Sequence, residues 1–353
     1  MNVFVGLSGG VDSAVAAHLL QQAGHRVQGI FVRIWQPEFM HCTMEEDRLS
    51  AKRVAAHLGI PFHEIDLSTH YRDTVIQDLI DGYQRGETPN PDMLCNQHIK
   101  FGALLTHVRQ LGADFLATGH YARVDHGPQE VRLLRGVDHT KDQSYFLARL
   151  SQDMLSHALC PLGELEKKAV RAIAASINLP NARRPDSQGL CFVGPVTMEE
   201  FLGHYIPLAP GNVLDATGTI VGEHHGAALY TIGQRHGFSV HAKSAQEAAQ
   251  YVVATDTAGN TITISPRMSD VSQHILPMHS LSWTSTTPEK NASIEFQVRY
   301  RQAPQHGTID PTTGILTARE PQHVAPGQSI VMFNGDQCIG GGIMSVHKES
   351  LQG

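Results

Sequence analysis

The stretch VFVGLSGGVDSAVAAHLL, residues 3–20, predicts a buried strand, a glycine-rich turn and a helix in direct succession. Glycines let the backbone approach an anion, Ser8 and Ser13 offer hydroxyl donors, and the first turn of a helix presents unpaired N–H groups. We therefore expect the loop at residues 8–13 to bind a phosphate or pyrophosphate. It has neither the Gly-Lys-Ser/Thr of a Walker A loop nor the G-x-G-x-x-G of a dinucleotide-binding turn.

Outward from this loop, strand and helix patterns alternate to about residue 180, which is typical of a parallel α/β sheet. Further strands are predicted at residues 25–35, 61–67 and 114–124. Helices are predicted where apolar residues recur at i, i+3, i+4 and i+7, around residues 43–58, 76–83, 101–108 and 170–177. Thr43 and Glu46 form a T-x-x-E capping box at the first of these helices.

Beyond residue 205 the pattern changes to short strands joined by the turn sequences DATGT, DTAGN, DPTTG and NGD. Alternation in residues 294–301 predicts a strand with Arg299 and Arg301 on its polar face and Tyr300 on its apolar face. We predict three domains: a nucleotide-binding and catalytic α/β domain at residues 1–205, a small central domain at 206–268 and a C-terminal β-barrel that contacts RNA at 269–353.

Composition limits the functional classes. No stretch of the 353 residues approaches the roughly 18 to 20 apolar residues that cross a bilayer, and the start lacks the features of a signal peptide. We expect a cytoplasmic protein with no membrane partner. Five scattered cysteines do not suggest a secreted disulfide framework. The net charge of −7 does not favour nucleic-acid binding, but a local basic face remains compatible with it.

Two cysteines share a local pattern, because Cys95 in NPDMLC and Cys191 in RPDSQGLC each follow a Pro-Asp pair in a predicted loop. We expect Cys95 just ahead of a helix, where the positive helix end favours the thiolate. Inert packing is one alternative. Zinc is another, since Cys95 and His98 form a C-x-x-H half-site, although no second pair stands near Cys191. Packing is the expectation for the other cysteines, Cys42, Cys160 and Cys338.

Eight motifs follow one another along nearly the whole chain: GLSGGVDS, CTMEEDRLSAKRVAAHLGIPF, TPNPDMLCNQHIKF, LATGHYAR, KDQSYFL, PDSQGLCFVG, YTIGQRHG and APGQS…GGGI. Together they closely resemble the bacterial tRNA-specific 2-thiouridylases. The resemblance implies a Rossmann-like parallel-sheet domain of the ATP-pyrophosphatase type, a small central domain and a C-terminal β-barrel. It implies ATP-dependent 2-thiolation of the wobble uridine of tRNA, by adenylation of the C2 oxygen and sulfur transfer from a cysteine persulfide, with release of AMP and pyrophosphate.

The same resemblance implies roles for single residues. Cys191 would carry the persulfide, Cys95 would be the nucleophile that attacks it, and Asp92 would be the acid or base. A transient Cys95–Cys191 disulfide would form. ATP would contact Gly6, Leu7, Ser8, Gly9, Gly10, Val11, Asp12, Ser13, Val32 and Gly119, with Asp12 as a candidate Mg²⁺ ligand. The target base would meet Asn90, Pro91 and Asp92, and tRNA would meet His120, Lys141, Asp142, Gln143, Arg299, Tyr300 and Gln328.

The implied partners are tRNA and a persulfide sulfur donor, either a sulfur-relay protein or a cysteine desulfurase. Two other functions stay open at this point. A ligase or amidotransferase with the same loop, like GMP synthetase or argininosuccinate synthetase, would use an amine as nucleophile and would need no paired thiols. A non-catalytic RNA-binding protein with a relic nucleotide pocket would not hydrolyse ATP to AMP and pyrophosphate.

Overall fold

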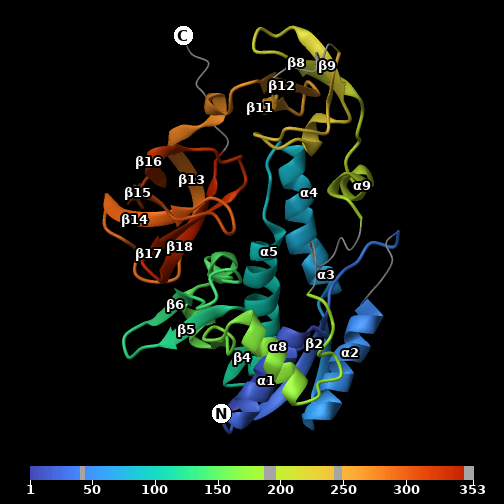
Figure 1. Ribbon diagram of the computed structural model, residues 1–353, viewed down its shortest axis with the longest axis vertical. Helices are drawn as coiled ribbons and strands as arrows, with labels where there is room; N and C mark the ends of the chain where they lie inside the picture. Colours follow the sequence, from blue (N-terminus) through green and yellow to red (C-terminus); the bar gives the residue numbers. More distant parts are fainter. Residues whose placement is uncertain (40–43, 187–195, 242–248, 346–353) are drawn as a thin grey trace.

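The computed structural model describes residues 1–39, 44–186, 196–241 and 249–345. It contains a five-stranded sheet in the N-terminal part, a second five-stranded sheet in the middle and an eight-stranded sheet at the C-terminal end (Figure 1). This confirms the predicted fold class. Thr43, Cys42 and Cys191 lie outside the described residues, so the capping box and the Cys95–Cys191 disulfide stay predictions, as do the domain boundaries.

The N-terminal sheet is parallel throughout, in the order β3-β2-β1-β4-β7. Its strands are β1 (Asn2–Gly6), β2 (Arg26–Arg33), β3 (Phe62–Asp66), β4 (Phe115–Ala117) and β7 (Ala158–Leu159). Because side chains alternate along a strand, Val3 and Val5 pack on one face and Phe4 on the other. The first face is covered by three helices, α1 (Val11–Gln22), α2 (Met44–Leu58) and α8 (Lys167–Ser176).

Two long helical runs lie toward the other face. One joins α3 (Ser68–Tyr71), the π-helical η1 (Arg72–Ile76) and α4 (Gln77–Gln84); the second joins α5 (Pro91–Leu94), the π-helical η2 (Cys95–Leu104) and α6 (Leu105–Gln110). Both extend well beyond the predicted helices at residues 76–83 and 101–108. The expectation that Cys95 precedes a helix is therefore wrong, because this helix already begins at Pro91.

The early helix start has a local cause. The Asn90 side chain accepts a hydrogen bond from the Met93 backbone N–H at 3.3 Å, as an N-cap residue does. Pro91 occupies the first helical position, where its fixed φ suits the helix and no N–H is needed. The sequence NPD, for which the turn-forming residues predict a loop, is thus a helix start signal.

The strand predicted at residues 114–124 is also wrong as one element, since it forms two strands in two different sheets. Its first part is β4, whereas its second part, β5 (Ala122–His126), forms a hairpin with β6 (Val131–Arg135). Strand β6 then pairs with β18 (Gln337–Met344). The hairpin therefore extends the sheet of the C-terminal barrel.

The barrel consists of β13 (Gln273–Trp283), β14 (Ala292–Gln297), β15 (Gln305–Asp310), β16 (Ile315–Gln322), β17 (Ser329–Asn334) and β18, and it closes through the pairing of β13 with β18. The strand predicted at residues 294–301 ends at Gln297. Arg301 has a left-handed φ of 64°, and the Val298 N–H donates to the Gln302 side chain at 2.8 Å, so the chain turns there. Arg299 and Arg301 therefore do not share a strand face.

The middle sheet has the order β10-β9-β8-β12-β11 and follows the short helix α9 (Met198–Gly203). Its strands are β8 (Gly211–Leu214), β9 (Ile220–His224), β10 (Ser239–Val240), β11 (Tyr251–Asp256) and β12 (Thr261–Ser265). The remaining helical elements are α7 (Gln152–Ser156) and the 3₁₀ turns η3 (Ser144–Leu147), η4 (Ala227–Leu229) and η5 (Met268–Val271). The four predicted turn sequences each join two antiparallel strands.

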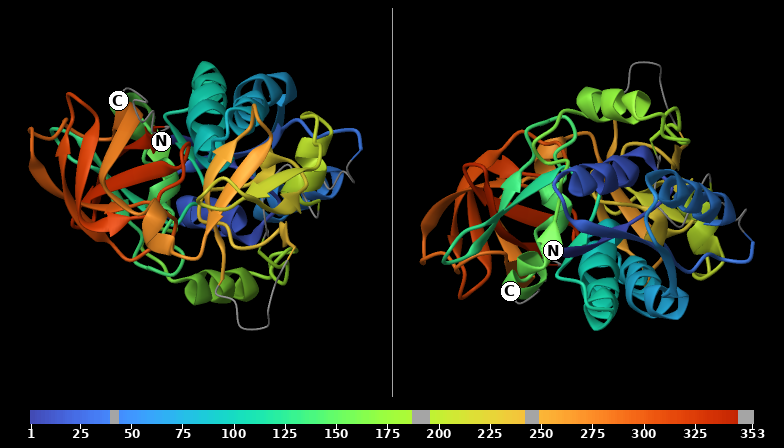
Figure 2. Two further views of the ribbon diagram at one scale, coloured as in Figure 1. Left: turned by 90° about the horizontal axis from the view of Figure 1, so that it is seen from above. Right: turned by 90° about the horizontal axis from the view of Figure 1, so that it is seen from below.

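Seen from above and from below, the barrel lies at one side of the molecule with the β5–β6 hairpin next to it (Figure 2). Leu133 of β6 is fully buried in a core that also contains Phe4 of the parallel sheet and Phe333 of the barrel. This core therefore joins the two parts of the chain. Among the described helices, none is long and apolar enough to cross a membrane.

We expect Leu133→Ala to lower the free energy of unfolding by about 2–5 kcal/mol, because a cavity forms in the shared core. Leu111→Ala is the matched control, since Leu111 is 47% exposed, and we expect its effect to stay within about 0.5 kcal/mol. Urea unfolding followed by circular dichroism measures both variants. Equal effects would contradict a shared core at β6.

Candidate functional site

The predicted phosphate loop connects β1 to α1 and is shaped by its glycines. Gly9 has a φ of 77°, and a Cβ atom there would lie 2.5 Å from the Asp47 carbonyl oxygen. Only glycine fits this position. The Gly9 carbonyl accepts hydrogen bonds from the Ser50 hydroxyl at 2.8 Å and the Asn181 amide at 2.9 Å. These bonds fix the loop beside the start of α1.

The loop lies where open parallel sheets bind ligands. In the order β3-β2-β1-β4-β7, the chain adds β2 and β3 on one side of β1 and then β4 and β7 on its other side, so the topological switch point lies between β1 and β4. Ligands bind beyond the carboxyl ends of strands at such a switch point. Gly119 follows β4, and a Cβ there would lie 2.8 Å from the Ser13 backbone nitrogen. The predicted ATP residues before α1 and after β4 are thus brought together, and Val32 lies near the carboxyl end of the neighbouring strand β2.

Asp12, in the first turn of α1, belongs to an ion network. Lys167 donates to its two carboxylate oxygens at 2.7 and 2.8 Å, and the Tyr121 hydroxyl donates to Oδ1 at 2.8 Å. Lys167 also lies 2.8 Å from Asp186. In this arrangement the partners of the Asp12 carboxylate are Lys167 and Tyr121, and the role of Asp12 as an Mg²⁺ ligand stays a prediction.

Asp186 ends the described segment that precedes Cys191, and three cations surround it. Lys141 lies at 3.0 Å, Lys167 at 2.8 Å and Arg171 at 2.5 Å from its carboxylate. Partial burial opposes ionisation, but the hydrogen bonds from Lys167 and Lys141 outweigh it and hold the pKa of Asp186 well below its usual range. This carboxylate is therefore ionised at neutral pH.

Asp92 and Cys95 lie on consecutive turns at the start of the second long helix. Burial raises the pKa of Asp92, and the ammonium of Lys100 on the same helix opposes that shift. Cys95 is buried among Leu79, Leu94 and Ile99. Within the described ranges no group of three or more His, Cys, Asp and Glu side chains could hold a metal. The Cys95–His98 half-site thus gains no further zinc ligands there.

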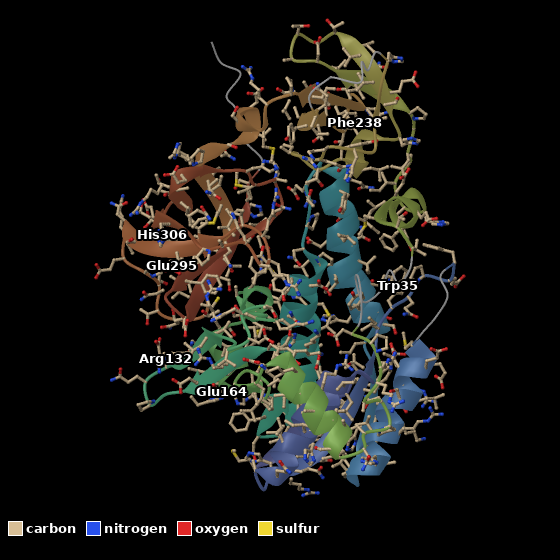
Figure 3. The ribbon with its side chains drawn as sticks, viewed as in Figure 1. Trp35, Arg132, Glu164, Phe238, Glu295 and His306 are labelled. Atoms are coloured by element: carbon tan, nitrogen blue, oxygen red, sulfur yellow. The ribbon has the colours of Figure 1, made fainter. Side chains whose placement is uncertain are left out.

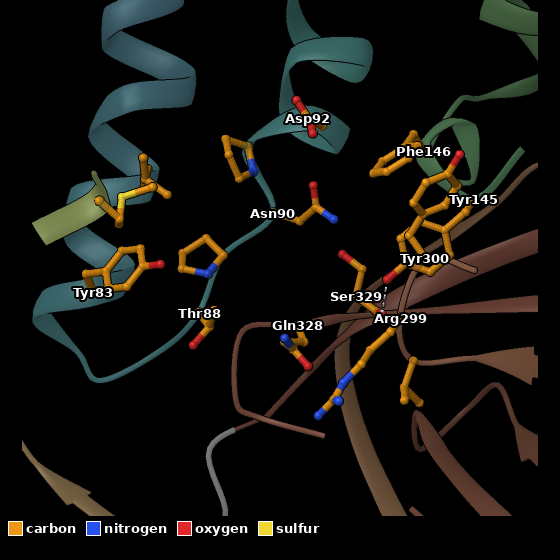
Figure 4. Close-up of a pocket in the computed structure, with 15 residues that line it drawn as sticks. Tyr83, Thr88, Asn90, Asp92, Tyr145, Phe146, Arg299, Tyr300, Gln328 and Ser329 are labelled. Atoms are coloured by element: carbon orange, nitrogen blue, oxygen red, sulfur yellow. Dashed lines mark hydrogen bonds between the residues drawn. The ribbon is translucent and has the colours of Figure 1, made fainter. Parts of the chain in front are cut away.

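A pocket of about 310 Å³ lies between this helix start and the barrel (Figure 4). Asn90, Pro91 and Asp92 line one side, and Arg299, Tyr300 and Gln328 line the other. These are the residues predicted to meet the target base, together with three of those predicted to meet tRNA. The structure therefore brings together segments that lie more than 200 positions apart in sequence.

Sequence reasoning missed the aromatic wall of this pocket. Tyr145 and Phe146 line it, and the Phe146 ring centroid lies 4.6 Å from that of Tyr300. The Tyr145 hydroxyl donates to the Ser329 carbonyl at 2.8 Å, which ties η3 to the barrel. The motif KDQSYFL contained these two rings, and adjacent aromatic residues in a polar motif were the available signal.

The half-buried side chain of Gln328 faces this pocket from the barrel side (Figure 4). Its Oε1 atom is shielded from solvent and has no hydrogen-bond partner within the described residues. A buried acceptor without a donor is unfavourable by about 1–3 kcal/mol.

Four other residues predicted to meet tRNA, His120, Lys141, Asp142 and Gln143, do not line the pocket, and two of them hold the surrounding backbone. The Asp142 carboxylate accepts from the Gly136 and Ser144 backbone N–H groups at 3.0 Å, and the Gln143 side chain accepts from the Tyr121 N–H at 3.0 Å. Lys141 binds Asp186, as described above. Their tRNA contacts stay predictions.

His120 links the segment after β4 to the second long helix. Its Nδ1 lies 2.7 Å from the Thr118 hydroxyl and its Nε2 lies 3.5 Å from the Lys100 ammonium. Burial, assisted by Lys100, holds the pKa of His120 well below its ordinary value, so the ring is neutral at pH 7. The segment after β4 thus touches both Ser13 and the helix that carries Asp92.

The cysteines expected to be inert fit that expectation where the structure describes them. Cys338 is fully buried, and burial raises the pKa of Cys160 and of Cys338 to about 12. Such thiols stay protonated at neutral pH and do not act as nucleophiles.

Three protein-family models match the chain. They are the tRNA methyl transferase HUP domain at residues 1–195, the tRNA methyl transferase PRC-barrel domain at 199–266 and the aminomethyltransferase β-barrel domain at 273–344. Among solved structures, the chain is similar to a 4-thiouridine synthetase in complex with RNA and ATP, with 17% identity, a TM-score of 0.35 and coverage of 58% of this chain and 50% of that one. A score this low carries no conclusion about function.

Similarity to whole proteins is much closer. The chain is 42% identical to the tRNA-specific 2-thiouridylase MnmA of Ralstonia nicotianae, covering 97% of this chain and 95% of that protein. It is 43% identical to the protein of the same name from Cupriavidus necator, covering 97% and 98%, and 40% identical to that from Lysinibacillus sphaericus, covering 97% and 93%. With this identity over nearly its full length, the chain belongs to the family of tRNA-specific 2-thiouridylases.

Proposed function

We propose that this chain catalyses the ATP-dependent 2-thiolation of the wobble uridine of tRNA. The observation that carries the proposal is the pocket in which Asn90 and Asp92 face Tyr300 and Gln328 of the barrel. Asp92 lies at the start of the helix that carries Cys95 one turn further on. Gly119 lies against the Ser13 backbone at the start of α1, and the next residue, His120, lies 3.5 Å from the Lys100 ammonium on this helix. An ATP site, a buried thiol and a pocket for a base are thereby joined.

The proposed reaction begins with adenylation. The C2 oxygen of uridine attacks the α-phosphorus of ATP, the bond to the β-phosphate breaks, and pyrophosphate leaves. Asp92, acting as base, takes the N3 proton, which increases the electron density on the C2 oxygen. Backbone N–H groups at the start of α1 bind the phosphates. Mg²⁺ is proposed as the companion of ATP, in keeping with phosphoryl-transfer chemistry.

Sulfur transfer follows. The terminal sulfur of a Cys191 persulfide attacks C2, and AMP leaves with its oxygen. The Cys95 thiolate then attacks Sγ of Cys191, so the sulfur–sulfur bond breaks, its electron pair stays on the sulfur at C2, and a Cys95–Cys191 disulfide forms. A thiol reductant reopens the disulfide, and a persulfide-carrying donor protein reloads Cys191. This sequence explains why two thiols are needed.

The pocket offers a site for a base that has left its stack, as base-modifying enzymes require. Phe146 and Tyr300 provide aromatic surfaces, and stacking of one base on such a ring contributes about 1–3 kcal/mol. Arg299 is exposed at the rim, where it can meet a phosphate. A local cation of this kind is compatible with the acidic total charge.

The test of this function is a thiolation assay with tRNA, ATP, Mg²⁺ and a persulfide donor. We expect 2-thiouridine to form together with one AMP and one pyrophosphate per turnover. AMP release that depends on ammonia and leaves tRNA unmodified would favour an amine ligase. Absence of ATP cleavage with intact tRNA binding would favour a non-catalytic RNA-binding protein.

We expect Cys95→Ser and Cys191→Ser each to lower thiolation at least about 100-fold, because serine neither carries a persulfide nor closes a disulfide. Cys160→Ser is the control, since burial raises the pKa of Cys160 to about 12 and this thiol is not reactive. Quantifying 2-thiouridine in tRNA digests measures all three variants. Full activity of Cys191→Ser would overturn the proposed sulfur route.

The pH dependence of thiolation is expected to report Asp92. Its pKa is raised by burial, so the carboxylate needed as base is lost as the pH falls through a value above that of an ordinary aspartate. The rate under single-turnover conditions should therefore fall on the acidic side. Asp92→Asn should lower the rate and abolish its decrease at acidic pH. The same decrease in this variant would show that another group titrates.

Binding of tRNA to Arg299→Gln is expected to weaken and to become less sensitive to salt. Loss of one phosphate contact should reduce the slope of log K against log salt concentration by about 1. Arg132→Gln is the control, because Arg132 pairs with Asp125 on the β5–β6 hairpin (Figure 3) and does not line the pocket. Equal slopes for Arg299→Gln and the unmodified protein would exclude this contact.

A further inference from the structure

The phosphate loop lacks a lysine of its own, but a lysine from a distant part of the chain reaches it. Lys167 is the first residue of α8, which packs against α1. Its ammonium donates to both oxygens of Asp12, at 2.7 and 2.8 Å. Asp12 lies inside the loop sequence, at the start of α1, so Lys167 places a positive charge beside the loop.

The position of this ammonium is fixed from several sides. The Lys167 side chain is 15% exposed, and a second carboxylate, that of Asp186, lies 2.8 Å from Nζ. The backbone N–H of Lys167 donates to the Asp138 carboxylate at 2.9 Å, which anchors the first turn of α8. A lysine normally loses much side-chain freedom on binding a ligand. Here that ordering is already present in the protein.

The neighbouring cations are engaged differently. Arg171 donates to the carbonyls of Ala182 and Arg184, and Arg184 donates to the carbonyl of Gly9. Both therefore hold backbone, and each also pairs with a carboxylate, Arg171 with Asp186 and Arg184 with Asp47. Lys141 contacts Asp186 and no described residue of the loop. Among the lysines that the structure describes, Lys167 is the one that contacts residues 8–13.

We propose that Lys167 is the lysine that binds the β- and γ-phosphates of ATP, and that Asp12 and Asp186 hold it in place until the nucleotide arrives. This inference rests on the proposed function of the loop. Lysine binds phosphate as a compact charge, and in other phosphate loops it is supplied by the loop itself. The phosphates replace the carboxylates as partners of Nζ. No covalent bond changes, and the contact persists on the pyrophosphate product.

Lys167 and Lys168 make a matched pair for the test. Lys168 is adjacent, 86% exposed and paired with Glu166. Isothermal titration calorimetry with ATP, pyrophosphate and AMP is performed on the full chain, on Lys167→Gln and on Lys168→Gln. We expect Lys167→Gln to weaken binding of ATP and of pyrophosphate about 10- to 100-fold, the loss of one charge-assisted hydrogen bond. AMP affinity and all three affinities of Lys168→Gln should change less than about 3-fold.

A loss of affinity for ATP and pyrophosphate but not for AMP distinguishes a role of Lys167 in phosphate binding from a purely structural role. Equal weakening of AMP and ATP, or unchanged binding of ATP and pyrophosphate, would overturn the proposal. Lys167→Arg keeps the charge and should retain most of the pyrophosphate affinity, which provides a second measurement if Lys167→Gln folds poorly. Thiolation by the unmodified protein is measured separately. Nucleotide binding with the expected split but without thiolation would reject the proposed function and leave the role of Lys167 intact.

Discussion

The pairing of β6 with β18 is the interaction on which the candidate site depends. Leu133 lies opposite Cys338 and Leu134 opposite Gln337, so the β5–β6 hairpin belongs to the sheet of the barrel. The same hairpin begins only five residues after Ala117, where β4 of the parallel sheet ends. A short covalent link and a shared core therefore hold the barrel against the N-terminal part, and the pocket exists only because of that placement.

Three aspartates near the site show how surroundings decide what one side-chain type does. Asp186 is held ionised by neighbouring cations, and Asp12 carries an ammonium on both oxygens. Asp92 is half-buried, and the loss of solvent raises its pKa although the Lys100 ammonium opposes that shift. Carboxylates with such different surroundings suit different tasks, namely anchoring a cation and moving a proton.

Periodicity and turn sequences predicted most elements of the chain, because their signals are local. Four of the five parallel strands, the three helices over the first face of the sheet and the four hairpins follow from patterns within about 20 residues, whereas the two-residue strand β7 was not predicted. The errors arose where tertiary contacts overrode local patterns. The sequence of residues 114–124 is strand-like throughout, but its first part pairs with β1 in the parallel sheet and its last part pairs with β6 in the barrel sheet. The alternation that ends at Gln297 continues to residue 301 in the sequence, whereas a left-handed Arg301 turns the chain.

The sequence by itself determined the phosphate loop, the order of the domains and the residues that carry the family pattern, since each is written in contiguous motifs. Only the tertiary structure decided that Asn90 and Asp92 face Gln328 and that Lys167 reaches Asp12. The lysine belongs to no motif, and its partner lies 155 positions away. Contacts of that kind depend on how helices and sheets pack, and no local spacing encodes them.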